Sequence, residues 1–159
     1  MDRLKIIQDT LDSYISKSDD LKKYSAHSYG VSAFAALLAK KRGLDPEIAA
    51  IMGLLHDIYA IHAGTYDKHD IKGAAMAKEI LSSTGLFSAK EIAIVEIAIV
   101  RHDARQETHG AYDEVLKDAD ILYPHLTNLP KEINPSVKER LNAMFKELLY
   151  FEQDSNFSN

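Results

Sequence analysis

The chain has 159 residues, of which 46% are hydrophobic and 27% charged, and its formal net charge is −5. This length suits one globular domain with a buried core, and the absence of cysteine excludes disulfides, thiolate metal sites and cysteine nucleophiles. The acidic balance, with no basic run longer than residues 40–42, disfavours nucleic acid as a main partner.

The longest segment without Asp, Glu, Lys or Arg spans residues 24–39. It is shorter than the ~20 apolar residues that a bilayer requires, and it contains several polar side chains. The N-terminus lacks the apolar core of a signal peptide. We therefore expect a cytoplasmic protein with no membrane partner.

The hydrophobic pattern is helical along nearly the whole chain. Apolar residues recur at helical spacing over residues 4–15 and predict a first helix. Polar and acidic residues at 18–20 predict the start of a second helix, which carries His27 and ends at Gly43.

A third helix is predicted from Asp45, an N-cap residue, and Pro46, which suits a first helical turn. It ends near His56, and residues 59–67 are expected to form a loop. A fourth helix then carries His69 close to its start and ends at about residues 84–85.

Ser88 and Glu91 have the spacing of a capping box. They predict that the Ile-rich segment 92–100 is a buried helix despite its strand-like residues, with His102 at its C-terminal end. Residues 103–110 are expected to form the following loop.

The next helix carries Asp120 and is expected to bend or stop near Pro124. A last helix is predicted over residues 134–149. We therefore expect an all-α fold, a single compact multi-helix bundle over residues 1–152, followed by a polar tail at 153–159.

The seven histidines are the first candidates for chemistry. A single histidine is more often a surface or core residue than a metal ligand. His62, His109 and His125 have no neighbours that suggest more than this.

The adjacent pair His56 and Asp57 differs because it lies at the edge of an apolar run. Burying a carboxylate beside an imidazole is costly unless the two groups are paired or bind a cation. A salt bridge or cap at a helix end is one explanation. A metal site is the other, completed by His27 from the second helix and Asp120 from the sixth.

The chain resembles the HD-domain metal-dependent phosphohydrolase superfamily over about residues 20–125. The resemblance rests on four features in the order typical of that family, namely residues 24–31 around His27, residues 53–58 around His56-Asp57, His69 followed by Gly73-Ala74, and residues 117–122 around Asp120. It implies a helical bundle whose core holds one or two divalent ions (Fe, Mn, Co, Ni or Zn).

The resemblance also implies roles for individual residues. The four signature metal ligands correspond to His27, His56, Asp57 and Asp120. Asp118 is then a solvated or supporting carboxylate.

The resemblance further assigns His69 and His102 to a second metal or to the substrate. Asp57, His69 and His102 are the implied catalytic residues, through orientation of water and proton transfer. Lys72 and Arg101 are candidate phosphate contacts, although both could equally be exposed cations at helix ends.

The implied function is hydrolysis of a phosphate ester or anhydride by metal-activated water, with a small phosphorylated substrate, most often a nucleotide, as partner. Two other functions remain open on the same residues. Some proteins of this fold are di-iron oxygenases, and a non-catalytic nucleotide- or metal-binding module would need the same side chains.

Overall fold

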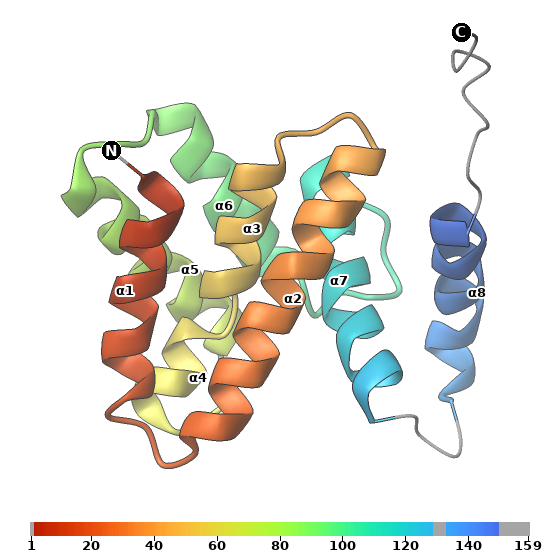
Figure 1. The fold of residues 1–159 in the computed structure, drawn as a ribbon, viewed down its shortest axis with the longest axis horizontal. Coiled ribbons are helices and arrows are strands. Elements are labelled where there is room, and N and C mark those ends of the chain that lie inside the picture. Colours follow the sequence, from red (N-terminus) through yellow and green to blue (C-terminus); the bar gives the residue numbers. More distant parts are fainter. Residues whose placement is uncertain (1, 129–132, 150–159) are drawn as a thin grey trace, which may run out of the picture.

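The computed structural model describes residues 2–128 and 133–149, which form eight α-helices and no β-strand (Figure 1). The helices are α1 (Arg3–Ile15), α2 (Leu21–Lys41), α3 (Pro46–Leu55), α4 (Ile58–Ala63), α5 (His69–Thr84), α6 (Ala89–Arg101), α7 (Ala111–Thr127) and α8 (Pro135–Leu149). They form one compact all-α bundle, as the sequence predicts.

Side chains cap several of the helix starts. Asp2, Asp20 and Asp45 each accept a hydrogen bond from a backbone N–H in the first turn of the helix that follows. At the start of α6, the Ser88 N–H donates to the Glu91 carboxylate (2.7 Å), and the Ser88 hydroxyl accepts from the Glu91 N–H (3.3 Å). The starts predicted for α2, α3 and α6 are thus confirmed.

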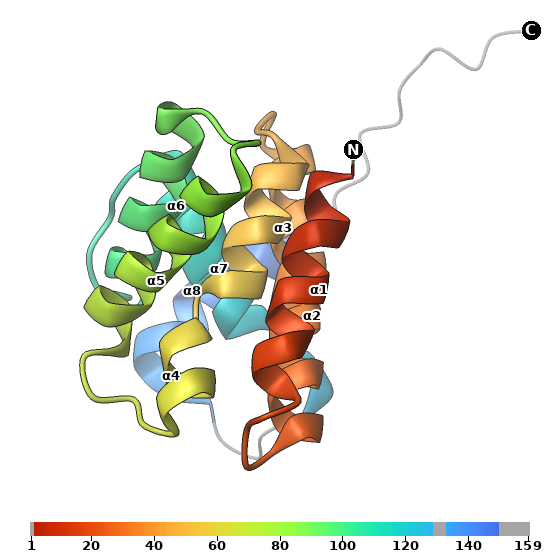
Figure 2. The same ribbon diagram turned by 90° about the vertical axis from the view of Figure 1, so that its left-hand side faces the viewer.

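Helix α2 packs against both α3 and α7, while α5 pairs with α6 on the side of α3 away from α1 and α2 (Figure 2). A continuous apolar core fills the space between these layers. Helices α2 and α3 approach closely because Gly53 has no side chain. A Cβ at this position would lie 2.6 Å from the Cα of Ser32.

The prediction of a loop over residues 59–67 is wrong for its first part, because residues 58–63 form the short helix α4. Ile58 and Ile61 are buried in the core, and Gly64 ends the helix with φ +66°. Six residues are too few to show helical periodicity in the sequence. Asp57 is the N-cap residue of α4, but its side chain makes no capping hydrogen bond.

Helix α7 does not stop at Pro124 but continues to Thr127. His102 is the C-cap residue of α6, as predicted, and α8 begins at the predicted place. The limits of the domain stay a prediction, and the tail at 153–159 lies outside the described residues. No helix in the described part of the chain is both long and apolar enough to cross a bilayer.

Candidate metal centre

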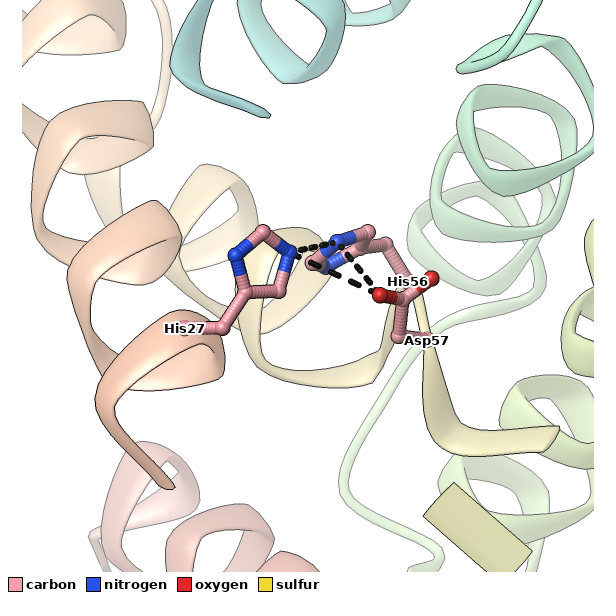
Figure 3. A group of neighbouring side chains, drawn as sticks. All are labelled: His27, His56 and Asp57. Atoms are coloured by element: carbon pink, nitrogen blue, oxygen red, sulfur yellow. Dashed lines mark hydrogen bonds and ion pairs between the residues drawn. The ribbon is translucent and has the colours of Figure 1, made fainter. Parts of the chain in front are cut away.

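Four side chains converge in the core, and we call them the primary centre. His27 comes from α2, His56 and Asp57 from the turn between α3 and α4, and Asp120 from α7. The His27 Nε2 lies 3.1 Å from the His56 Nε2, 3.5 Å from the Asp57 Oδ2 and 3.3 Å from the Asp120 Oδ1. Figure 3 shows three of the four pointing at one another.

A second centre shares Asp57 with the first. The other carboxylate oxygen of Asp57, Oδ1, lies 3.5 Å from the His69 Nε2 and 3.9 Å from the His102 Nε2, and these two nitrogens are 3.1 Å apart. Asp103, which the sequence analysis did not single out, places its Oδ2 3.4 Å from the His69 Nε2. Asp57 therefore joins two clusters, one through each oxygen.

Backbone carbonyls fix three of the four imidazoles. In each ring the Nδ1 atom lies within hydrogen-bond distance of a carbonyl three residues earlier, so Nδ1–H donates to that carbonyl, and in the neutral ring the Nε2 lone pair is directed at the centre. The pairs are His56 with Gly53 (2.8 Å), His69 with Tyr66 (3.0 Å) and His102 with Ile99 (2.6 Å).

Charge within the centres favours a cation. Burial lowers the pKa of His56, but the carboxylates of Asp57 and Asp120 outweigh this effect and raise the pKa to about 9. Burial also raises the pKa of Asp120, yet hydrogen bonds from His27 and His56 hold it well below its usual range. Burial and the nearby charge of His56 lower the pKa of His102. The carboxylates therefore attract positive charge, which a bound cation would supply in place of the His56 proton, and the lowered pKa of His102 favours the neutral ring that binds a metal.

The donor set fits divalent transition metals. Two groups of three residues, His27 with His56 and Asp57, and Asp57 with His69 and His102, each offer nitrogen and oxygen donors within 4.8 Å of one another. Ligands bound ~2.1 Å from one ion lie about 3.0–3.5 Å apart. Imidazole and carboxylate donors suit Fe, Mn, Co, Ni or Zn. Bound cations would also compensate the burial of Asp57, which is only 5% exposed.

The centres open into a cavity of about 620 Å³ whose lining includes His27, Asp57, His69, His102 and Asp120. Two cations that the sequence analysis missed, Lys68 and Arg105, also line it. The Arg105 Nη2 donates to the Asp120 Oδ2 (2.6 Å). The sequence could have indicated both residues by their closeness to candidate metal ligands, because Lys68 directly precedes His69 and Arg105 follows His102 by three residues.

Lys72 and Arg101 do not line this cavity. The Lys72 amine donates to the Tyr59 hydroxyl (3.0 Å), and the Arg101 Nη1 donates to the Asp113 carboxylate (2.9 Å). Their role as phosphate contacts stays a prediction, and the geometry favours the pair Lys68 and Arg105 for that role.

Asp118 lies away from both centres, although it is only two residues before Asp120. Its Oδ2 accepts from the Arg42 Nη2 (2.6 Å), and its Oδ1 lies 3.0 Å from the Arg140 Nε. Asp118 thus joins α2, α7 and α8. The remaining histidines, His62, His109 and His125, contribute no donor to either centre.

Comparison with known proteins agrees with this geometry. A family model for the HD domain matches residues 24–124, a segment that contains every donor of the two centres. The chain belongs to the HD-domain family. The predicted resemblance is therefore confirmed.

Several relatives of this chain are described as Ribonuclease Y. The protein from Clostridium tetani is 32% identical over 132 residues, which is 82% of this chain and 22% of the relative. The protein from Clostridium kluyveri is 30% identical over 121 residues, 76% of this chain and again 22% of the relative. The chain thus spans about a fifth of the length of these relatives.

A solved structure shares the HD-domain fold. It is described as a predicted HD superfamily hydrolase from an uncultured Thermotogales bacterium, and it aligns with a TM-score of 0.63 at 22% identity, covering 87% of this chain and 85% of the other. The match to the HD-domain family model supports the expectation of a metal-dependent hydrolase.

Chelation is expected to destabilise the protein. Buried carboxylates and imidazoles from several helices meet at the centres, so removing the ions leaves their burial uncompensated. A ligand present at about 1,000 times its Kd contributes about 4 kcal/mol, which corresponds to a fall in Tm of roughly 10 °C for a domain of this size. Scanning calorimetry with and without EDTA measures the shift, and Mn²⁺, Fe²⁺ or Co²⁺ should restore it. Identical melting curves would contradict a core metal site.

Proposed function

We propose that this HD-domain protein is a metal-dependent phosphohydrolase that cleaves a phosphate ester or anhydride of a nucleotide with water. The observation that carries the proposal is that the two carboxylate oxygens of Asp57 face two different pairs of imidazoles. Oδ2 lies 3.5 Å from the His27 Nε2, and Oδ1 lies 3.5 Å from the His69 Nε2. A carboxylate that faces two donor clusters is the arrangement that two-metal phosphoryl transfer uses.

Ions held by these donors would lower the pKa of water and stabilise the charge that develops on the phosphoryl oxygens. The chain supplies the other components. Asp57 accepts a hydrogen bond from the attacking water and orients it. Lys68 and Arg105 line the cavity and bind phosphate oxygens. If only the primary centre holds an ion, the His69 Nε2 is free to take up a proton, and the resulting imidazolium would give it to the leaving group.

A nucleotide fits the charge of the molecule better than a long nucleic acid. The chain has a net charge of −5, whereas a nucleic-acid surface requires clustered cations. RNA is the second candidate, because curated relatives that share 30–32% identity with this chain are named ribonucleases.

The test begins with elemental analysis of protein purified without chelators. We expect two divalent ions per chain, and one in the double variant His69→Ala/His102→Ala, which should keep its helical circular dichroism. A panel of nucleotides and short RNA is then assayed with the metal found, and nucleotides should be cleaved faster. Iron with an oxygen-sensitive absorption band and no hydrolysis would instead indicate an oxygenase. Saturation of wild type at one equivalent would refute the two-metal form.

A further inference from the structure

A second cavity of about 350 Å³ adjoins the metal centres and shares three lining residues with the first, His27, Tyr66 and Pro124. The residues that line only the second cavity are not donors of either centre. A ligand held in the first cavity can therefore extend into the second. The volume is within the range of ~300–1,000 Å³ that small-molecule sites occupy.

Two tyrosine rings line this cavity, and each contacts a histidine of a metal centre. The Tyr123 ring meets the His27 ring edge-on, with 5.6 Å between centroids. The Tyr66 ring meets the His69 ring in the same way at 5.1 Å. Both aromatic side chains are therefore positioned relative to the two centres, Tyr123 beside the primary one and Tyr66 beside the second.

The position of Tyr123 depends on Gly30 of α2. A Cβ at residue 30 would lie 2.0 Å from the ring of Tyr123, so glycine is what allows the ring to lie against the helix. The Tyr123 ring is thus held by the α2 backbone on one side and by His27 on another. A rigid aromatic surface of this kind loses little entropy when a ligand stacks on it.

The remaining lining is polar. The Lys23 amine lies 5.7 Å from the centroid of the Tyr66 ring, and Thr127 and Asn128 add a hydroxyl and an amide. A cavity with aromatic faces and hydrogen-bonding groups matches a flat heteroaromatic ring whose edge carries donors and acceptors. An alkyl chain would use the rings but leave the polar groups without a hydrogen-bond partner.

We infer that the second cavity binds the base of a nucleoside monophosphate whose phosphate lies in the metal cavity. This inference rests on the proposed function and assigns the substrate class of that site. A mononucleotide is favoured over an RNA strand because Asp70 and Asp103 line the metal cavity beside its cations and would repel the additional phosphates of a strand.

The test compares adenosine 5′-monophosphate with ribose 5-phosphate, which has the same phosphate and sugar without the base. The kcat/KM of wild type should be higher for the nucleotide by a factor of about ten or more. Stacking of a base on an aromatic side chain contributes about 1–3 kcal/mol, which corresponds to such a factor. Tyr66→Leu and Tyr123→Leu should each reduce this preference about tenfold, mainly through KM, since the base does not take part in the chemical step.

Tyr14→Leu is the matched control. Tyr14 lies on α1 against His62 and lines neither cavity, so this variant should keep the wild-type preference. Equal kcat/KM for the two substrates in wild type, or an unchanged preference in both cavity variants, would overturn the inference. Cleavage of short RNA with a higher kcat/KM than the mononucleotide would also overturn it.

If neither compound is hydrolysed, the proposed function fails separately, and binding still tests the cavity. Titration calorimetry of adenosine 5′-monophosphate should then give a Kd at least tenfold lower than that of ribose 5-phosphate. Tyr123→Leu should raise the Kd of the nucleotide about tenfold. Equal affinities in that experiment would overturn the inference.

Discussion

Replacing His56 or Asp57 with alanine is expected to remove metal from the protein and to abolish hydrolysis. The His56 Nε2 lies 3.5 Å from the Asp57 Oδ2 and 3.6 Å from the Asp120 Oδ1, and Asp57 is the only described residue that belongs to both donor clusters. Loss of His56 removes one donor from the primary centre, whereas loss of Asp57 removes one from each. We expect kcat/KM to fall by roughly 10³-fold or more.

Metal content by elemental analysis and kcat/KM on the same samples measure this effect. Because His56 is fully buried, His56→Ala could also unfold the protein, so Asp57→Asn, which keeps the size of the side chain, is measured beside it. The matched control is His62→Ala, which removes an exposed histidine outside both centres and should leave metal and activity at the wild-type level. Full metal content and activity in both Asp57 variants would show that the centre is elsewhere.

Gly53→Ala is expected to lower the stability of the fold considerably, although it adds only one methyl group. The added Cβ would lie 2.6 Å from the Cα and 2.7 Å from the N of Ser32, and backbone atoms of a packed helix cannot move aside cheaply. Overpacking costs about 1–3 kcal/mol, and a clash with backbone atoms places this variant at the upper end, about 3 kcal/mol, against a gain of about 1 kcal/mol that alanine brings to a helix. We expect a net loss of about 2 kcal/mol and a Tm lower by roughly 6 °C.

Gly73→Ala in α5 is the matched control, because there the nearest atom to the new Cβ is the His56 carbonyl oxygen at 3.4 Å, an ordinary contact. Its Tm should stay equal or rise. Gly53→Ala should in addition weaken metal binding, since it pushes α2, which carries His27, away from α3, which leads to His56. Equal melting temperatures for Gly53→Ala and wild type would contradict the close approach of α2 and α3.

The helices could be predicted because their signals are local. Asp45 with Pro46, and Ser88 with Glu91, specify a helix start within four residues of sequence, and the structure uses both. Helix α4 could not be predicted in this way, because its six residues form a helix chiefly by burying Ile58 against the core. That is a property of the tertiary structure.

The donors of the candidate site could be named from the sequence, but the shape of its cavity could not. Arg105 reaches Asp120 only because the segment after α6 folds back over α7. The fully buried Lys117 fixes that fold by donating to the Glu107 carbonyl (2.8 Å) and to the His109 Nδ1 (2.7 Å). A lysine in a sequence is normally predicted to be exposed, so nothing in the residues next to Lys117 predicts that it is buried and holds this segment.

Asp57 occupies the N-cap position of α4 without capping it, because its carboxylate faces the imidazoles of the two centres instead. One carboxylate cannot at the same time accept from the first turn of a helix and face two pairs of imidazoles. A cap contributes about 1 kcal/mol, so the start of α4 lacks about that much stability because Asp57 serves the two centres. Selection for thermal stability alone, without metal, would therefore favour a side chain at residue 57 that turns to the helix start and away from the imidazoles, at the expense of the centres.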